Sequence, residues 1–253
     1  MAEIGLGDEL MVSGLCRVAQ QTDPRKVRVQ YEKGKRRWCE LWDGNPRIAT
    51  WKEEGDFQIL EPRQNYLRPY CEAKTERQWT WKEYHPPHGE IYFYPWEKAF
   101  GDVNRGHVVL APWLKAGASP NKQWGERRWQ ELARLLGENG LKLLTMGPGQ
   151  PRITSKHINC SIRQAAAVIE TARAVVTHEG AIHHIAAALG TPAVVIRGGY
   201  IGPRVTGYDG QVDFFGDDGL GCGMRVPCAH CAAAMAAITP EAVAEKTLKV
   251  TRD

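Results

Sequence analysis

The chain has 253 residues and a formal net charge of +4, and 43% of its residues are apolar while 25% are charged. These values are ordinary for a soluble globular protein, and they exclude a disordered, collagen-like or coiled-coil chain. No run of about 18 apolar residues predicts a membrane span, and the first residues lack the regions of a signal peptide, so we expect a cytoplasmic protein whose seven cysteines are reduced.

The two halves of the chain differ in composition. Residues 1–105 contain 15 of the 22 aromatic residues and carry 17 basic and 17 acidic residues. Residues 106–253 carry 16 basic and 12 acidic residues, so the whole positive excess lies there. We therefore predict an aromatic-rich N-terminal domain over residues 1–105 and a second domain over residues 106–253.

The first half has weak secondary-structure patterns. Apolar residues on one side predict a helix over residues 8–21. The segment 61–90 holds four prolines among charged and aromatic residues, and we expect irregular structure there. Alternation of apolar and polar residues predicts short strands over residues 27–31, 47–51, 57–60 and 91–94.

In the second half, predicted strands alternate with predicted helices. The strands are expected over residues 108–112, 141–146, 174–177 and 193–197, and the helices over residues 124–140, 161–172, 181–189 and 239–250. This alternation is typical of a parallel sheet covered by helices on both faces. Such sheets bind ligands beyond the carboxyl ends of their strands, where the loops 147–151 and 177–182 are expected.

The segment 173–197 consists of a strand, a polar turn and a helix of small residues. Such a turn presents backbone N–H groups to an anion at the N-terminus of the helix. Glu179 in the turn could accept a hydrogen bond from a ribose or another hydroxyl group. The same pattern occurs at any strand-to-helix turn of a parallel sheet, so the residues alone leave both interpretations open.

This segment resembles glycosyltransferase family 9, the lipopolysaccharide heptosyltransferases, whose members have an Asp-Thr-Gly turn, a His and an Ala-rich helix that ends before a Pro. Aligned from Pro192, the acidic residue corresponds to Glu179, the Thr to Gly180, the Gly to Ala181 and the His to His184. Because the Thr is replaced, backbone N–H groups are expected to hold the phosphate. The donor-binding residues that the resemblance implies here are Glu179, Gly180, Ala181, Ile182 and either His183 or His184.

Two further segments resemble the same family. Lys122, followed by Trp124 and Trp129, is similar to a Lys-x-Trp-x4-Trp segment whose Lys approaches the donor diphosphate. A Lys in a strand-to-helix loop supplies a point charge to a pyrophosphate, although a solvated surface Lys has the same pattern.

Residues 5–8 are similar to the Gly-Asp loop of the family, which implies substrate contacts by Gly5 and Gly7 and a catalytic base at Asp8. Asp is also a good helix N-cap, so Asp8 could have only that role. Glu9 is the alternative base.

The resemblance implies an α/β protein of the GT-B type, with two Rossmann-like domains facing a cleft and the N-terminal one reduced, because the chain is short for the family. It implies inverting transfer from a nucleotide-diphosphate sugar to a hydroxyl acceptor, by default lipopolysaccharide or another glycan. The chain contains no Asp-x-Asp motif, so we expect no essential metal and no cofactor. Gly147 begins a turn that is expected beside the nucleotide, although a plain turn has the same residues.

The alternatives are a glycosyltransferase acting on DNA or protein, and a non-catalytic nucleotide-sugar or nucleic-acid binding module. Residues 25–37 contain seven basic residues and one acidic residue near aromatic side chains. Such a stretch can bind single-stranded nucleic acid, but a sugar-binding surface or a solvated strand edge has the same composition. Since the first half is neutral overall, a glycan acceptor is favoured over nucleic acid. The oligomeric state is open.

A cysteine-rich segment lies near the end of the chain. Its Cys-x2-Cys spacing is typical of metal ligands, although only one such pair is present and Cys160 would have to be the distant partner. Zinc, a disulfide and free thiols are all compatible with the sequence. The residues concerned are Cys222, Cys228, His230 and Cys231.

Overall fold

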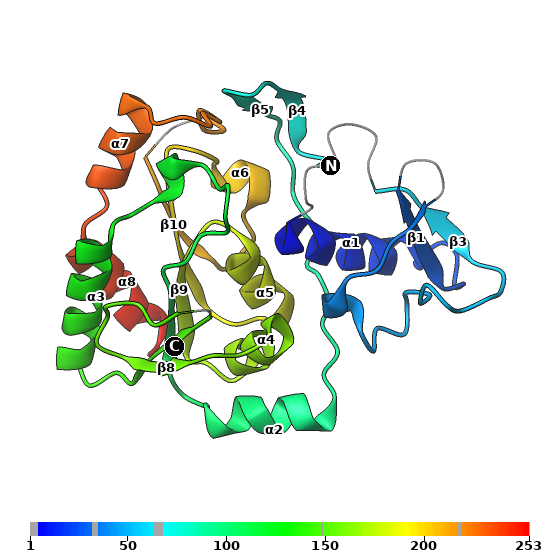
Figure 1. Cartoon of the computed structure of the whole chain (residues 1–253), viewed down its shortest axis with the longest axis horizontal. Helices are drawn as coiled ribbons and strands as arrows, with labels where there is room; N and C mark the ends of the chain where they lie inside the picture. Colours follow the sequence, from blue (N-terminus) through cyan, green and yellow to red (C-terminus); the bar gives the residue numbers. More distant parts are fainter. Residues whose placement is uncertain (1–4, 32–34, 63–67, 148, 217–218, 253) are drawn as a thin grey trace.

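The computed structural model describes residues 5–31, 35–62, 68–147, 149–216 and 219–252. Its second half contains a sheet (Figure 1) that has six strands. The strand order is β11-β10-β9-β6-β7-β8, and every neighbouring pair is parallel. This confirms the predicted parallel sheet. The strands are β6 (Val108–Ala111), β7 (Leu143–Met146), β8 (Lys156–Ile158), β9 (Ala174–His178), β10 (Ala193–Gly198) and β11 (Val212–Phe215).

Helices cover both faces of this sheet, as the alternation of elements predicts (Figure 1). On one face lie α3 (Glu126–Glu138), α7 (Ala229–Ala236) and α8 (Pro240–Val250), and on the other lie α4 (Ile162–Glu170) and α5 (Ala181–Leu189). Side-chain oxygens cap two of the helices, because Ser161 accepts from the N–H of Gln164 and Thr239 from that of Ala242. The short helix α6 (Pro203–Thr206) follows β10.

The first half forms a smaller unit around one helix, α1 (Leu6–Ala19). Beside it lie β1 (Val27–Tyr31), β2 (Lys35–Arg36) and β3 (Gln58–Leu60), in the order β2-β1-β3, with β1 parallel to β3 and antiparallel to β2. A 3-10 turn, η2 (Glu40–Trp42), places the fully buried Trp42 in the core of this unit. This unit, with its three strands and one helix, is small, as expected for a reduced N-terminal part.

The remaining segments of the first half reach the second half. A hairpin of β4 (Cys71–Lys74) and β5 (Trp79–Trp81) extends toward the end of β10, and α2 (Pro95–Val103) packs on α4. Gly101 of α2 permits that packing, because a Cβ there would overlap the carbonyl of Ala167. The domain boundary near residue 105 stays a prediction.

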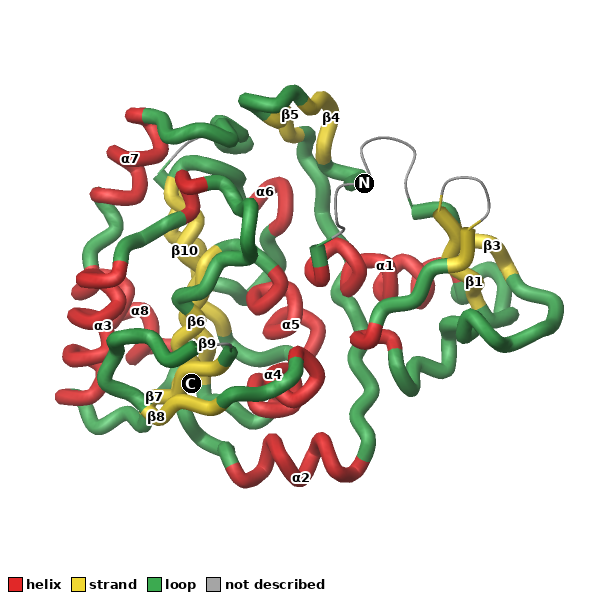
Figure 2. Tube along the Cα trace, in the orientation of Figure 1, coloured by secondary structure: helices red, strands yellow, loops and turns green. Residues whose placement is uncertain are grey.

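Helix α1 lies between the two halves and contacts α5 (Figure 2). Leu10 of α1 is buried in the same core as Ile185 and Ala186 of α5. The N-terminus of α1 and the N-terminus of α5 therefore lie close to one another. No helix within the described ranges is both long and apolar enough to cross a membrane.

The sequence predictions for the second half were confirmed to within a few residues, but several short elements differ. Residues 47–51 and 91–94 are not strands; Ile48 makes a single bridge to Val27, and residues 91–94 lead extended into α2. Alternation identifies extended residues but not a partner strand. The hairpin β4–β5 contradicts the irregular structure expected for residues 61–90. The sequence patterns also missed the edge strands β8 and β11 and the helices α2, α6 and α7.

Candidate active site

A cavity of about 760 Å³ opens where the two halves meet. Its walls are the N-terminus of α1, the hairpin β4–β5, the loop 113–122 that ends in η3 (Pro120–Lys122), and the carboxyl end of β9 with the N-terminus of α5. The predicted site residues that line it are Gly5, Gly7, Asp8, Lys122, Glu179, Gly180, Ala181, Ile182 and His184. The resemblance thus named residues far apart in the sequence that share one cavity.

Asp8 is a buried carboxylate in this cavity. Its Oδ2 accepts hydrogen bonds from Gly5 N at 3.2 Å and Arg68 Nε at 3.0 Å, and its Oδ1 accepts from the Tyr70 hydroxyl at 2.5 Å. The N-cap of α1 is Gly5, and Asp8 is the third helical residue. Asp8 is therefore not the N-cap, although it does satisfy the N–H of the N-cap residue. Burial and the neighbouring Asp8 charge raise the pKa of Tyr70, which stays a neutral donor.

Glu9 does not line the cavity, so it is not an alternative base there. Its carboxylate accepts from the hydroxyl of Tyr31 at 2.8 Å and from Nη2 of Arg37 at 2.8 Å. Successive helical residues do not share a face, which is why Asp8 and Glu9 contact different neighbours of α1.

Lys122 and Glu179 form an ion pair in which Nζ of Lys122 contacts Oε2 of Glu179. The hydroxyl of Thr206 donates to the other carboxylate oxygen at 3.2 Å. Burial would raise the pKa of Glu179, but the charge of Lys122 and other nearby positive groups lower it well below its ordinary value. Glu179 is therefore ionised, and Lys122 is ion-paired rather than a solvated surface lysine.

The two adjacent histidines have different surroundings. His183 is absent from the cavity wall; its Nδ1 accepts from Gly180 N at 2.9 Å and its Nε2 donates to the carbonyl of Thr206 at 2.8 Å. Burial lowers its pKa far below the usual value, so the ring is neutral. His183 therefore links the turn before α5 to Thr206, and it occupies the N–H of Gly180, which the resemblance assigned to the phosphate.

His184 lines the cavity and contacts α1. Its Nδ1 is 2.8 Å from the hydroxyl of Tyr208, and its ring lies against Gly7, where any Cβ would overlap it. Burial lowers the pKa of His184 to about 4. The ring is neutral at physiological pH and supplies no positive charge to a phosphate.

Gly147 does not line the cavity. It lies beside the indole of Trp113, which does line the cavity and donates to the carbonyl of Met146 at 2.9 Å. Gly147 thus lies beside a residue of the cavity wall, and not in the wall where its contact with a nucleotide was expected. The next residue of that turn, at position 148, lies outside the described residues.

Several residues that line the cavity were not identified as site residues from the sequence. Lys115 has no carboxylate partner among the described residues, and partial burial together with the charge of Arg68 lowers its pKa. His178 accepts from Trp124 N at 3.2 Å and is neutral, since burial lowers its pKa to about 3. The charged side chains that line the cavity are Arg68, Lys74, Lys115, Lys122 and Arg225, against Asp8, Glu76 and Glu179. The cavity thus has a positive excess that an anionic ligand would neutralise.

Four of the basic residues that the structure describes in the stretch 25–37 have acidic partners. Arg25 pairs with Asp23 and Asp56. The other ion pairs are Lys26 with Glu53, Arg36 with Glu54, and Arg37 with Glu9. Ion pairing of these four residues weakens the nucleic-acid interpretation. Only β2 is a solvated strand edge, because β1 is the central strand of its sheet and is partly buried.

Comparisons with known proteins show the family of the chain and its fold. The sequence model of glycosyltransferase family 9 (heptosyltransferase) matches residues 58–200. The fold is similar to that of a family 9 glycosyl transferase from Veillonella parvula DSM 2008, with a TM-score of 0.68 and 15% identity over 98% of this chain and 95% of that one.

The structure of ADP-heptose lps heptosyltransferase II of E. coli is also similar, with a TM-score of 0.51 and 20% identity over 65% of this chain and 54% of that one. The chain thus aligns with about half the length of the E. coli enzyme but with nearly all of the Veillonella protein. No curated protein matches the sequence.

Proposed function

Because this chain belongs to glycosyltransferase family 9 (heptosyltransferase) and has the α/β fold of its GT-B members, we propose that it transfers a sugar from a nucleotide-diphosphate sugar to a hydroxyl acceptor in the cavity described above. Transfer inverts the anomeric centre in one displacement. The default acceptor is lipopolysaccharide or another glycan.

One observation carries this proposal: a buried carboxylate, Asp8, shares a cavity with the N-terminus of a helix and several cationic side chains. At the N-terminus of α5, no described group accepts from the N–H of Ala181 or Ile182. These N–H groups and the ammonium groups of Lys115 and Lys122 would hold the donor diphosphate and stabilise its charge as it departs.

Asp8 is the proposed general base. An ionised carboxylate offers about four lone-pair positions, and Gly5, Arg68 and Tyr70 use three of them. The fourth can accept the proton of the acceptor hydroxyl. As the acceptor oxygen bonds to the anomeric carbon, its proton passes to Asp8, and the anomeric C–O bond breaks with its electron pair going to the diphosphate. Arg68 and Tyr70 hold the carboxylate in position for this transfer.

We propose that the cations replace a catalytic metal in this cavity. Glu179, His183 and His184 lie close enough to hold a metal ion. However, Lys122 occupies the carboxylate of Glu179, and both ring nitrogens of His183 are hydrogen-bonded. A metal there would have to displace all three contacts, so the donor set fits an ion poorly.

ADP-heptose is the first donor to test, because it is the donor named for the similar E. coli enzyme. Thermal shift against a panel of nucleoside diphosphates and nucleotide sugars tests the site directly. A ligand at about 100 times its Kd stabilises the protein by about 2.7 kcal/mol. We expect ADP and ADP-heptose to raise the Tm; if no member of the panel raises it, the proposal is wrong.

A non-catalytic nucleotide-sugar binding module is the second candidate. It is favoured by the occupied N–H of Gly180, since the diphosphate then has fewer ligands than the family turn supplies. Both candidates require nucleotide binding but only the transferase requires Asp8, so replacement of Asp8 separates them.

A further inference from the structure

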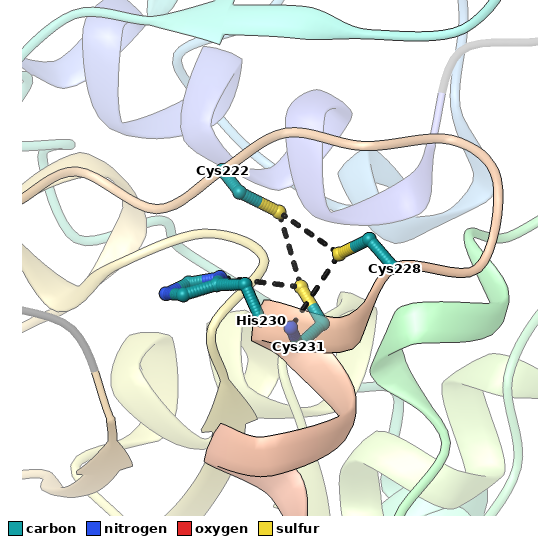
Figure 3. A group of neighbouring side chains, drawn as sticks. All are labelled: Cys222, Cys228, His230 and Cys231. Atoms are coloured by element: carbon teal, nitrogen blue, oxygen red, sulfur yellow. Dashed lines mark hydrogen bonds between the residues drawn. The ribbon is translucent and has the colours of Figure 1, made fainter.

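Three cysteines and a histidine lie close together at the start of α7 (Figure 3). The Sγ of Cys222 lies 3.1 Å from that of Cys231 and 3.8 Å from that of Cys228. The Nδ1 of His230 lies 3.9 Å from the Sγ of Cys231. All four ligand atoms lie within 4.8 Å of one another.

The separation of 3.8 Å between the sulfurs of Cys222 and Cys228 is that of a four-coordinate zinc site, whereas the 3.1 Å between those of Cys222 and Cys231 is shorter. A tetrahedral ion with Zn–S bonds of about 2.3 Å places its sulfur ligands about 3.8 Å apart. Thiolate and imidazole are the ligands that such structural sites use. Cys160, the distant partner that the sequence required, is not in the cluster, and His230 supplies the fourth ligand instead.

Backbone N–H groups point at two of the sulfurs of the cluster. Met224 N donates to the Sγ of Cys222 at 3.4 Å, and Cys231 N donates to the Sγ of Cys228 at 3.4 Å. Cys228 is the N-cap of α7, so the positive end of that helix faces the sulfurs. Such N–H contacts to coordinating sulfur are typical of metal sites.

The chain is also shaped to bring the ligands together. Gly221 and Gly223, on either side of Cys222, have φ of +96° and +65°, which disfavour other residues. Gly199 leaves space for the imidazole, because a Cβ there would lie 2.6 Å from Cε1 of His230.

We propose that Cys222, Cys228, Cys231 and His230 bind one structural zinc ion. The ion ties the loop 220–228 to α7. That loop is bonded in turn to the cavity walls: Gly223 O accepts from Trp79 N at 3.0 Å, and Met224 O accepts from the Asn121 side chain at 2.9 Å. Zinc therefore fixes the positions of the hairpin β4–β5 and of η3, which carries Lys122.

Metal analysis of the purified full chain, in a reductant that does not chelate metals, tests this inference. We expect about one zinc per chain, lost in Cys228→Ser and retained in the matched control Cys160→Ser, whose thiol is also half-buried and free. His230→Ala should weaken zinc binding less than Cys228→Ser, because it removes a neutral ligand.

A second measurement covers the case in which Cys228→Ser fails to fold. Wild-type protein is stripped with a chelator and titrated with Co²⁺, whose thiolate complexes absorb in the visible range, and then with Zn²⁺. We expect the cobalt absorption to appear, zinc to abolish it, and the Tm to rise on zinc addition. Three results would each overturn the proposal. The wild-type protein could contain no zinc and bind no Co²⁺, it could contain one equivalent of iron instead of zinc, or the purified protein could contain a Cys222–Cys231 disulfide. None of these results depends on the glycosyltransferase activity.

Discussion

The ammonium of Lys122 and the carboxylate of Glu179, 57 positions apart in the sequence, form an ion pair at the N-terminus of α5. The two side chains are only 18% and 6% exposed. Both residues were expected to contact the donor, and the structure shows that they contact one another. The proposed donor site therefore contains a preformed ion pair rather than a free lysine.

Lys122→Met should destabilise the protein by about 3 kcal/mol, because it leaves the buried charge of Glu179 without its partner. The double variant Lys122→Met, Glu179→Gln should recover much of that loss, yet neither variant should bind a nucleoside diphosphate normally. Urea denaturation and calorimetric titration measure the two effects separately. Equal stability losses in the single and double variants would show that the pair is not the cause.

Lys115 offers a contrasting test, since no described carboxylate pairs with it. Lys115→Met should weaken nucleoside diphosphate binding about tenfold, the effect of one lost hydrogen bond to a charged group, with little change in Tm. Lys246→Met, an exposed lysine of α8, is the matched control and should bind normally. Calorimetric titration at low and high salt measures both variants, and unchanged affinity in Lys115→Met would remove Lys115 from the donor site.

Gly7 permits the contact between α1 and α5 because its missing side chain makes room for the ring of His184. Gly7→Ala should destabilise the protein by about 1–3 kcal/mol, the usual cost of inserting a methyl group into a packed core. Gly137→Ala in α3 is the matched control, since nothing lies within 4 Å of a Cβ there, and it should stabilise by about 0.5–1 kcal/mol. A neutral effect of Gly7→Ala on the urea midpoint would contradict the close packing of the two helices.

The buried histidines predict acid sensitivity. The pKa of His184 is about 4 in the folded protein and about 6.5 in an unfolded chain, so the unfolded state binds the proton first as the pH falls. The contribution of neutral His184 to the free energy of unfolding is therefore fully present above pH 6.5 and is lost progressively between about pH 6.5 and pH 4. His184 alone should lower the free energy of unfolding by about 2 kcal/mol at pH 5.

Urea denaturation at pH 7 and pH 5 measures this loss, and His184→Gln should show a smaller difference between the two pH values than the wild type. His157→Gln, a histidine on the edge strand β8, is the control. A wild-type stability that does not change between pH 7 and pH 5 would contradict the neutral, buried state of His184.

Local patterns predicted the elements that hold the donor side of the site. The strand β9, the turn at Glu179 and helix α5 are adjacent in the sequence, so their hydrophobic pattern and small residues identify them without tertiary information. Family resemblance added Lys122 and Asp8, whose motifs are short but in the expected order.

Other features of the site depend on contacts between distant segments. Arg68 and Tyr70 contact Asp8 across 60 and 62 positions, from a segment expected to be irregular, and no spacing rule identifies such partners. The choice between His183 and His184 likewise depends on which ring faces Thr206 and which faces α1. The cysteine cluster could be proposed from spacing, but its fourth member could not be assigned, because Cys160 and His230 differ only in where the fold places them.

The most direct test of the proposed function compares Asp8→Asn with wild type for binding of ADP-heptose and for release of ADP from it, with Asp102→Asn, an exposed carboxylate of α2, as control. Loss of a general base lowers turnover by about 10²–10⁴-fold. We predict a loss of that size in Asp8→Asn, with a donor Kd within a few-fold of wild type and normal turnover in Asp102→Asn. Turnover by Asp8→Asn at the wild-type rate, or failure of the wild type to bind any nucleotide sugar, would contradict the proposed mechanism.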